Sequence, residues 1–207
     1  MKVSIVAGVV SLGLLVTAAQ AQEEYRNDAT VSALGSFQQS TSGKGINQTS
    51  TDSAGVLATY RFFFTNHQGV EVNYGYSRFS QQFTSLTTSA PFQGTLGVPA
   101  NTNEATASYV LRWGLGHRLT PFVSAGTGAL LFTPTNSFAV GGIGSSTFAT
   151  PDFVYSAGAD FALSRRVSFR LGYRGHVYQA PDFGIAGIGT GSVTHMAEPF
   201  GGVSFHF

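Results

Sequence analysis

The chain of 207 residues contains no cysteine. Disulfide bonds therefore do not stabilise it, and an exported domain of this size must be held together by its core, by a membrane or by backbone hydrogen bonds. The same absence excludes a lipoprotein, because no thiol is present to carry the lipid.

Charged residues are also scarce. They make up 10% of the chain, whereas aromatic residues make up 13% and glycine contributes 26 residues. Ordinary soluble domains contain roughly 25% charged residues, so this composition does not require a surface in contact with water. Removal of Lys2 with the leader described below leaves ten basic and ten acidic residues. No basic excess remains that would attract nucleic acid.

Long apolar runs are also missing, except at the N-terminus. Lys2 is followed by the apolar segment Val3–Val16, and small residues then end in Ala19 and Ala21. Small side chains at the last and third-last positions are what signal peptidase requires, so the sequence predicts cleavage between Ala21 and Gln22. A retained membrane anchor is the alternative, but the run is shorter than the roughly 20 residues that a helix needs to cross a bilayer. We therefore expect a signal peptide at residues 1–21 and a single outer-membrane domain at residues 22–207.

Without a second apolar run, the membrane-spanning structure that remains is a β-barrel, in which neighbouring strands satisfy every backbone group. Such strands alternate lipid-facing apolar residues with small or polar ones. The segment Asp152–Leu163 shows this alternation, and so does Val167–Arg174. Only Ser164, Arg165 and Arg166 separate the two segments, which predicts a tight hairpin.

The same alternation predicts eight strands in all. They are Ala29–Gln38, Gly55–Phe62, Val70–Ser77, Glu104–Trp113, Thr120–Phe132, Asp152–Leu163, Val167–Arg174 and Gly202–Phe207. Within the fifth strand, Gly126 and Gly128 are expected to face inward. The fold class predicted is an all-β, eight-stranded antiparallel up-and-down transmembrane β-barrel.

Short connections between the predicted strands alternate with long ones. The long ones, rich in Ser, Thr, Gly, Asn and Pro, are Ser40–Ser53, Thr84–Asn103, Thr133–Thr150 and Gln179–Val193. This asymmetry is typical of outer-membrane barrels, which have tight periplasmic turns and long external loops. An even strand number places both ends of the barrel in the periplasm. A soluble sandwich or lipocalin-like barrel is the rival architecture, but it would carry charge on its outer face.

Ionisable residues fall on the predicted inner face of several strands. They are Arg61, Glu71, Glu104, Arg112, Asp160, Arg170, Arg174, His176 and Glu198. The interior of an eight-stranded barrel is just wide enough to be filled by side chains, so we expect these charges to pair across the lumen, with Arg61 near Glu71 and Asp160 near Arg170. A structural network is the first interpretation, because buried charges must be paired. A narrow conduit is the alternative.

Catalytic and cofactor sites are not predicted. His176 and His195 lie near the outer ends of the last two strands, but the residue two positions after His176 is Tyr178 rather than a serine nucleophile, so Ser–His–acid chemistry lacks support. The five histidines are scattered and predict no metal site. Aromatic residues near strand ends predict interfacial girdles. These are Phe62, Phe63, Phe64, Trp113, Phe132, Phe153, Tyr173, Tyr178, Phe205 and Phe207.

The C-terminal residues Val203, Phe205 and Phe207 look like the terminal signature of outer-membrane barrels. Together with Pro121–Gly128 and Ser156–Phe161, they resemble the OmpA-like outer-membrane β-barrel superfamily. The resemblance covers the chain after the leader and implies that the barrel-assembly machinery reads the C-terminal residues. No peptidoglycan-binding domain follows Phe207, so no cell-wall tether is implied.

A further segment, Leu171–Phe183, resembles one in acidobacterial-type barrels of the same superfamily. This similarity suggests a lineage and no activity.

These features predict a non-enzymatic, monomeric barrel in contact with outer-membrane lipid and lipopolysaccharide. Its role would be structural, or would depend on surface contacts made by four external loops. A narrow small-solute channel is the alternative, and a lipid A-modifying enzyme is a second one.

Overall fold

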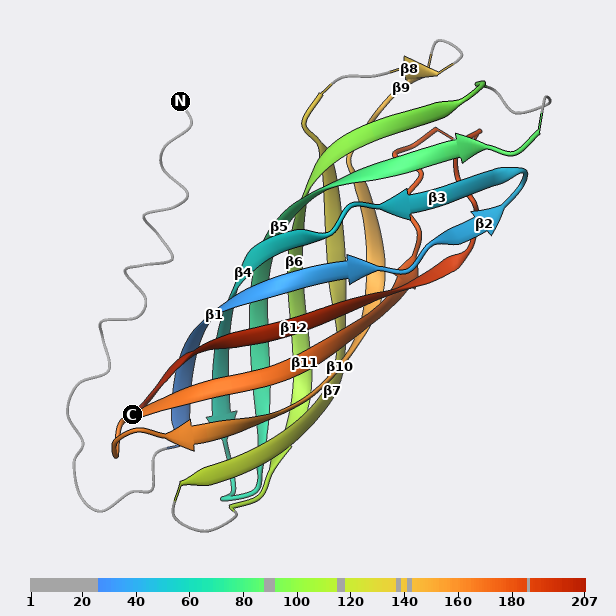
Figure 1. Ribbon diagram of the computed structural model, residues 1–207. Coiled ribbons are helices and arrows are strands. Elements are labelled where there is room, and N and C mark those ends of the chain that lie inside the picture. The colour runs from blue at the N-terminus through green and yellow to red at the C-terminus, as the bar shows by residue number, and fades with distance from the viewer. Residues whose placement is uncertain (1–25, 88–91, 115–117, 137–138, 141–142, 186) are drawn as a thin grey trace, which may run out of the picture.

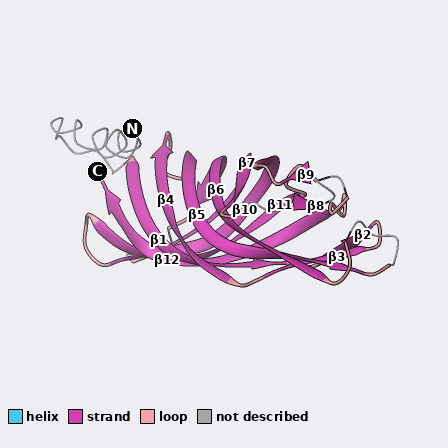
Figure 2. Ribbon diagram, turned by 90° about the horizontal axis from the view of Figure 1, so that it is seen from above, coloured by secondary structure: helices cyan, strands magenta, loops and turns pink. Residues whose placement is uncertain are grey.

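The computed structural model describes residues 26–87, 92–114, 118–136, 139–140, 143–185 and 187–207. The predicted signal peptide and its cleavage residues Ala19, Ala21 and Gln22 lie outside the described residues. Strands make up most of the described chain (Figures 1 and 2), in which no helix is long and apolar enough to cross a bilayer. The strands are β1 (Asn27–Gln38), β2 (Thr41–Gly43), β3 (Ile46–Ser50), β4 (Ser53–Phe63), β5 (Gln68–Ser85), β6 (Thr95–Arg112), β7 (Leu119–Pro134), β8 (Ala139–Val140), β9 (Ile143–Gly144), β10 (Phe148–Ala162), β11 (Val167–Gln179) and β12 (Val193–His206).

Eight of these strands close into an antiparallel barrel, which confirms the predicted fold class. The order around the ring is β1, β4, β5, β6, β7, β10, β11 and β12, and β1 closes it by pairing with β12. At this closure Asp28 is opposite His206, and the backbone nitrogen of Asn27 donates to the carbonyl of Phe207 at 3.1 Å. No sheet edge is left within the ring, which is the condition for a sheet to cross a bilayer.

The side chains alternate between lumen and exterior as predicted. On β10, Phe153 and Tyr155 are exposed, whereas Asp152 and Ser156 are buried. Gly126 and Gly128 on β7 face inward, where a Cβ atom at Gly126 would collide with the carbonyl of Ala107 on the neighbouring strand. Glycine is required at this position because the neighbouring strand leaves no room for a side chain.

The long connections are shorter than the sequence predicted, because strands extend into them. In the predicted loop Thr84–Asn103, the structure places the end of β5 and nine residues of β6. The predicted loop Ser40–Ser53 contains the β2–β3 hairpin, which pairs with the outer end of β5. Figure 1 shows these extensions on the same side as β8 and β9, opposite the C-terminus.

In these extensions the polarity of the two faces is inverted. On β5, the outward residues change from Tyr74 and Tyr76 to Arg78, while the inward residue becomes Phe79. The alternation continues with polar residues outside and apolar residues inside, as in a water-soluble barrel. The prediction was wrong here because it sought strands with an apolar exterior.

The inward apolar residues of the extensions form a buried cluster, here called the outer core. It contains Ile46, Phe79, Phe83, Val98, Ala100, Leu130, Phe132, Tyr178, Phe183, Ile185, Ile188 and Met196. Phe183, Ile185 and Ile188 come from the connection between β11 and β12, which folds into the barrel mouth. This cluster corrects the predicted girdle, because Phe132 and Tyr178 belong to the outer core rather than to the lipid face.

Phe63 also departs from the predicted girdle. It is 2% exposed and belongs to a smaller inner cluster of apolar residues. Other predicted girdle residues, including Phe62, Phe64 and Trp113, are exposed near the short turns.

Candidate functional site

The interior of the barrel is occupied by successive layers of side chains, which can be followed along β12. Met196 belongs to the outer core, Glu198 to a charged layer beneath it, and Phe200 to the inner apolar cluster. Further toward the turns, Ser204 lies beside a second charged layer. Its hydroxyl oxygen is 2.7 Å from that of Thr30. We call the charged layer nearer the outer core the upper network and the other the lower network.

Arg170 on β11 is the centre of the lower network. Its Nε donates to Asp160 at 2.5 Å, and its Nη2 donates to Asp28 at 3.2 Å and to the second oxygen of Asp160 at 2.9 Å. A planar guanidinium suits such multiple contacts with carboxylates. Arg170 is opposite Asp160 in the strand register, and the two form one of the pairs expected from the sequence.

Arg61 and Glu71 form the second predicted pair, and they are also opposite each other in register. The Nε of Arg61 donates to Glu71 at 2.7 Å, and the Arg61 guanidinium lies 4.0 Å from the ring centre of Phe122. Ser124 donates to the other oxygen of Glu71 at 2.8 Å. Both charges are therefore paired and hydrogen-bonded in the barrel interior, as buried ions require.

The upper network joins β6, β10, β11 and β12. Arg174 donates from Nη1 to Glu104 at 2.6 Å and to Glu198 at 3.4 Å. His176 is fully buried, with Nδ1 at 2.6 Å from Asp152 and Nε2 at 3.2 Å from Glu198. Its Nε2 also lies 3.4 Å from Glu104. The predicted lumen residues Glu104, Arg174 and Glu198 thus meet in one cluster.

Two members of these networks were not among the predicted charged residues. Asp28 precedes the predicted first strand, yet it lies two residues before the inward Thr30, so the period of two could have identified it. Asp152 is the first residue of the predicted sixth strand, and its contact with His176 runs diagonally between β10 and β11, because His176 is opposite Val154. The alternation of residues along one strand gives no information about such diagonal partners on the next strand.

Arg112 and His195 lie in other surroundings. Arg112 is half-buried at the turn end, with its guanidinium 3.6 Å from the ring centre of Phe63 and its Nε donating to the carbonyl of Asn66 at 3.0 Å. His195 stacks on Tyr155 on the exterior and is 2.9 Å from its hydroxyl oxygen. The two histidines weighed as catalytic candidates therefore lie on opposite faces of the wall.

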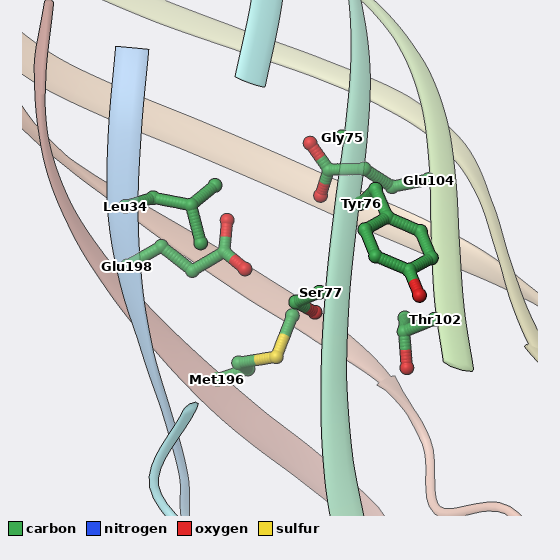
Figure 3. Close-up of a pocket in the computed structure, with 8 residues that line it drawn as sticks. All are labelled: Leu34, Gly75, Tyr76, Ser77, Thr102, Glu104, Met196 and Glu198. Atoms are coloured by element: carbon green, nitrogen blue, oxygen red, sulfur yellow. The ribbon is translucent and has the colours of Figure 1, made fainter. Parts of the chain in front are cut away.

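The space left beside the upper network is small. A cavity of about 10 Å³ is lined by Leu34, Gly75, Tyr76, Ser77, Thr102, Glu104, Met196 and Glu198. In Figure 3 the carboxylates of Glu104 and Glu198 point toward one another from opposite sides of this space. Room for about one water molecule is all that such a volume provides.

The outer end carries a wider hollow of about 310 Å³, lined by Thr133, Pro134, Thr135, Asn136, Ser145, Ser146 and Thr147. None of these side chains is ionisable.

A family model described as the outer membrane protein beta-barrel domain matches residues 7–193. The chain belongs to this family. No curated protein sequence matches the chain.

Solved structures that resemble this family member include barrels from bacterial outer membranes. OprG of Pseudomonas aeruginosa has a TM-score of 0.62 at 13% identity, with 89% of this chain and 97% of OprG covered. Neisserial surface protein A has a TM-score of 0.58 at 14% identity, with 87% and 97% covered. Ail, the attachment invasion locus protein of Yersinia pestis, has a TM-score of 0.54 at 14% identity, with 89% and 100% covered. At these identities the similarity establishes the fold, and the family places the chain in the bacterial outer membrane.

Proposed function

We propose that this protein is a non-enzymatic, non-conducting barrel that holds a β-structured surface platform at the outer face of the membrane. The observation that carries the proposal is the filled interior, in which two charged networks and two apolar clusters follow one another along the barrel. A solute would have to separate buried ion pairs, and breaking such a pair costs about 3–5 kcal/mol.

The platform consists of the strand extensions and the β2–β3 hairpin. Its structure is anchored by the outer core, so it is built like a small soluble domain above the lipid. The described charged side chains of this end are few, namely Lys44, Asp52, Arg78 and Asp182. This surface is nearly neutral and rich in hydroxyl and amide groups. It is better suited to hydrogen bonding with glycans or proteins than to electrostatic attraction of a strongly charged polymer.

The relatives support a surface role. The name of Ail refers to attachment and invasion, and one of its structures contains the heparin analogue sucrose octasulfate. For this chain we propose contact of the platform with lipopolysaccharide sugars or a host or neighbour surface, made by a monomeric barrel embedded in outer-membrane lipid.

The proposal also extends to the export and assembly of the barrel. We propose that the leader is cleaved between Ala21 and Gln22, and that the barrel-assembly machinery reads Val203, Phe205 and Phe207. All three of these C-terminal residues are exposed on the outside of the barrel end.

Deletion of the β2–β3 hairpin of the platform tests the surface role. Replacing residues 41–50 with a two-residue turn removes β2 and β3 but leaves the eight ring strands. Cells producing this variant should lose adhesion to surfaces while keeping membrane integrity and the folded barrel. Unchanged adhesion after this and equivalent deletions in the other outer connections would contradict a surface role and leave a purely structural one.

A further inference from the structure

His176, Glu104 and Glu198 place three potential metal ligands around one point in the upper network. Their donor atoms all lie within 4.8 Å of one another, and all three residues are buried. The Nε2 atom of His176 is 3.4 Å from Glu104 and 3.2 Å from Glu198. A tetrahedral zinc ion with bonds of about 2.0–2.1 Å would hold its ligands about 3.3 Å apart.

The orientation of His176 is fixed by Asp152. The 2.6 Å contact between Nδ1 and Asp152 assigns the Nδ1 proton to this hydrogen bond and directs Nε2 toward the two glutamates. In protein metal sites, a histidine ligand commonly donates its other ring nitrogen to a carboxylate in this way. A bare Nε2 lone pair facing two carboxylates would be repulsive, so either a proton on Nε2 or a metal ion must lie between them.

The charge balance of the cluster points to the same conclusion. Asp152, Glu104 and Glu198 supply three negative charges, and Arg174 supplies one positive charge. With a neutral imidazole, two negative charges remain in a buried site, and a divalent cation would neutralise them. Uncompensated buried charge is costly.

An unpartnered hydroxyl lies at the edge of the same space. Thr102 is 3% exposed, and its Oγ1 has no hydrogen-bond partner. It lines the cavity of about 10 Å³ that Glu104 and Glu198 also line (Figure 3). The cavity has room for about one water molecule, which would serve as the fourth ligand and reach the Thr102 hydroxyl.

We propose that the upper network is a zinc site, with His176, Glu104 and Glu198 as ligands and Asp152 as the positioning residue for His176. The sequence had predicted no metal site, because its ligands come from three different strands. Since the outer core covers this layer and the lower network lies beneath it, zinc would enter while the barrel closes and would leave slowly afterwards.

The test is metal content after refolding. The barrel is refolded into detergent with Zn²⁺, washed with a chelator, and analysed by elemental mass spectrometry, with folding checked by heat-dependent gel mobility. Wild type should retain one zinc per chain, and His176→Gln should retain none. The matched control His195→Gln, which changes an exterior histidine, should retain it, and Asp152→Asn should bind zinc about 10–100-fold more weakly.

Absence of zinc from wild type, or equal zinc in His176→Gln, would overturn the proposal and leave a proton as the positive centre. Loss of zinc from His195→Gln as well would also overturn it, by pointing to an exterior site. If His176→Gln does not fold, Co²⁺ substitution of wild type decides. An intense tetrahedral visible spectrum supports the site, and a weak octahedral one contradicts it.

Discussion

Arg170 shows how single residues stabilise the interior. It is 1% exposed and contacts both Asp28 and Asp160. In Arg170→Met, Asp28 would stay buried without its cation, and Asp160 would keep only Arg61, at 3.7 Å. We therefore expect a loss of about 3–5 kcal/mol in the free energy of unfolding, the usual cost of breaking a buried pair. Guanidinium unfolding in detergent micelles measures this loss.

The control for that experiment is Arg165→Met, in the exposed turn between β10 and β11. Its free energy of unfolding should stay within about 0.5 kcal/mol of wild type. Equal effects of the two substitutions would show that the lower network does not stabilise the barrel.

Gly126 makes a second prediction at the residue scale. A Cβ atom there would meet the carbonyl of Ala107 and the backbone of Ser108, which cannot move without displacing β6. Gly126→Ala should therefore lower the free energy of unfolding by about 1–3 kcal/mol, as overpacking does. Gly97→Ala is the matched control on β6, because only Ser80 lies nearby, at 3.9 Å. Similar unfolding midpoints for the two variants would contradict this explanation of the glycine.

At the scale of strands, the inversion of polarity on β5 marks the level where the barrel leaves the lipid. Val72 is exposed to the exterior below this level, and Gln82 is exposed above it. The native chain has no cysteine, so single thiols can be introduced cleanly. In proteoliposomes, Gln82→Cys should react rapidly with a charged maleimide and Val72→Cys should be protected. Equal labelling would place the membrane boundary elsewhere.

The eight strands and their pairing partners were predictable because a period of two is repeated over every lipid-facing segment. The pairs Arg61–Glu71 and Asp160–Arg170 followed from it, since short turns fix the register of hairpins. The outer extensions were not predictable in the same way. In Thr95–Ala100, for example, small residues and proline obscure an inward apolar face that becomes visible only when β6 pairs with β5. The upper network also required the closed barrel, because Glu104 lies far in sequence from Arg174 and Glu198.

For the whole molecule, the structure combines two kinds of barrel along one axis. The half with short turns has an apolar exterior and a charged interior, and the half with long connections has a polar exterior and an apolar interior. This arrangement predicts the orientation in the cell. An epitope inserted at Lys44–Gly45, in the β2–β3 turn, should be detected on intact cells. An epitope at Arg165 should be detected only after permeabilisation, and the reverse pattern would contradict the orientation.

The central claim, that the barrel is closed by its own interior, is tested most directly by conductance. Purified, refolded protein in a planar lipid bilayer should give no stepwise openings, because the charged networks and the outer core fill the lumen. Regular openings of wild type that disappear on neutralising Arg170 or Glu71 would contradict the claim and assign the lumen to transport.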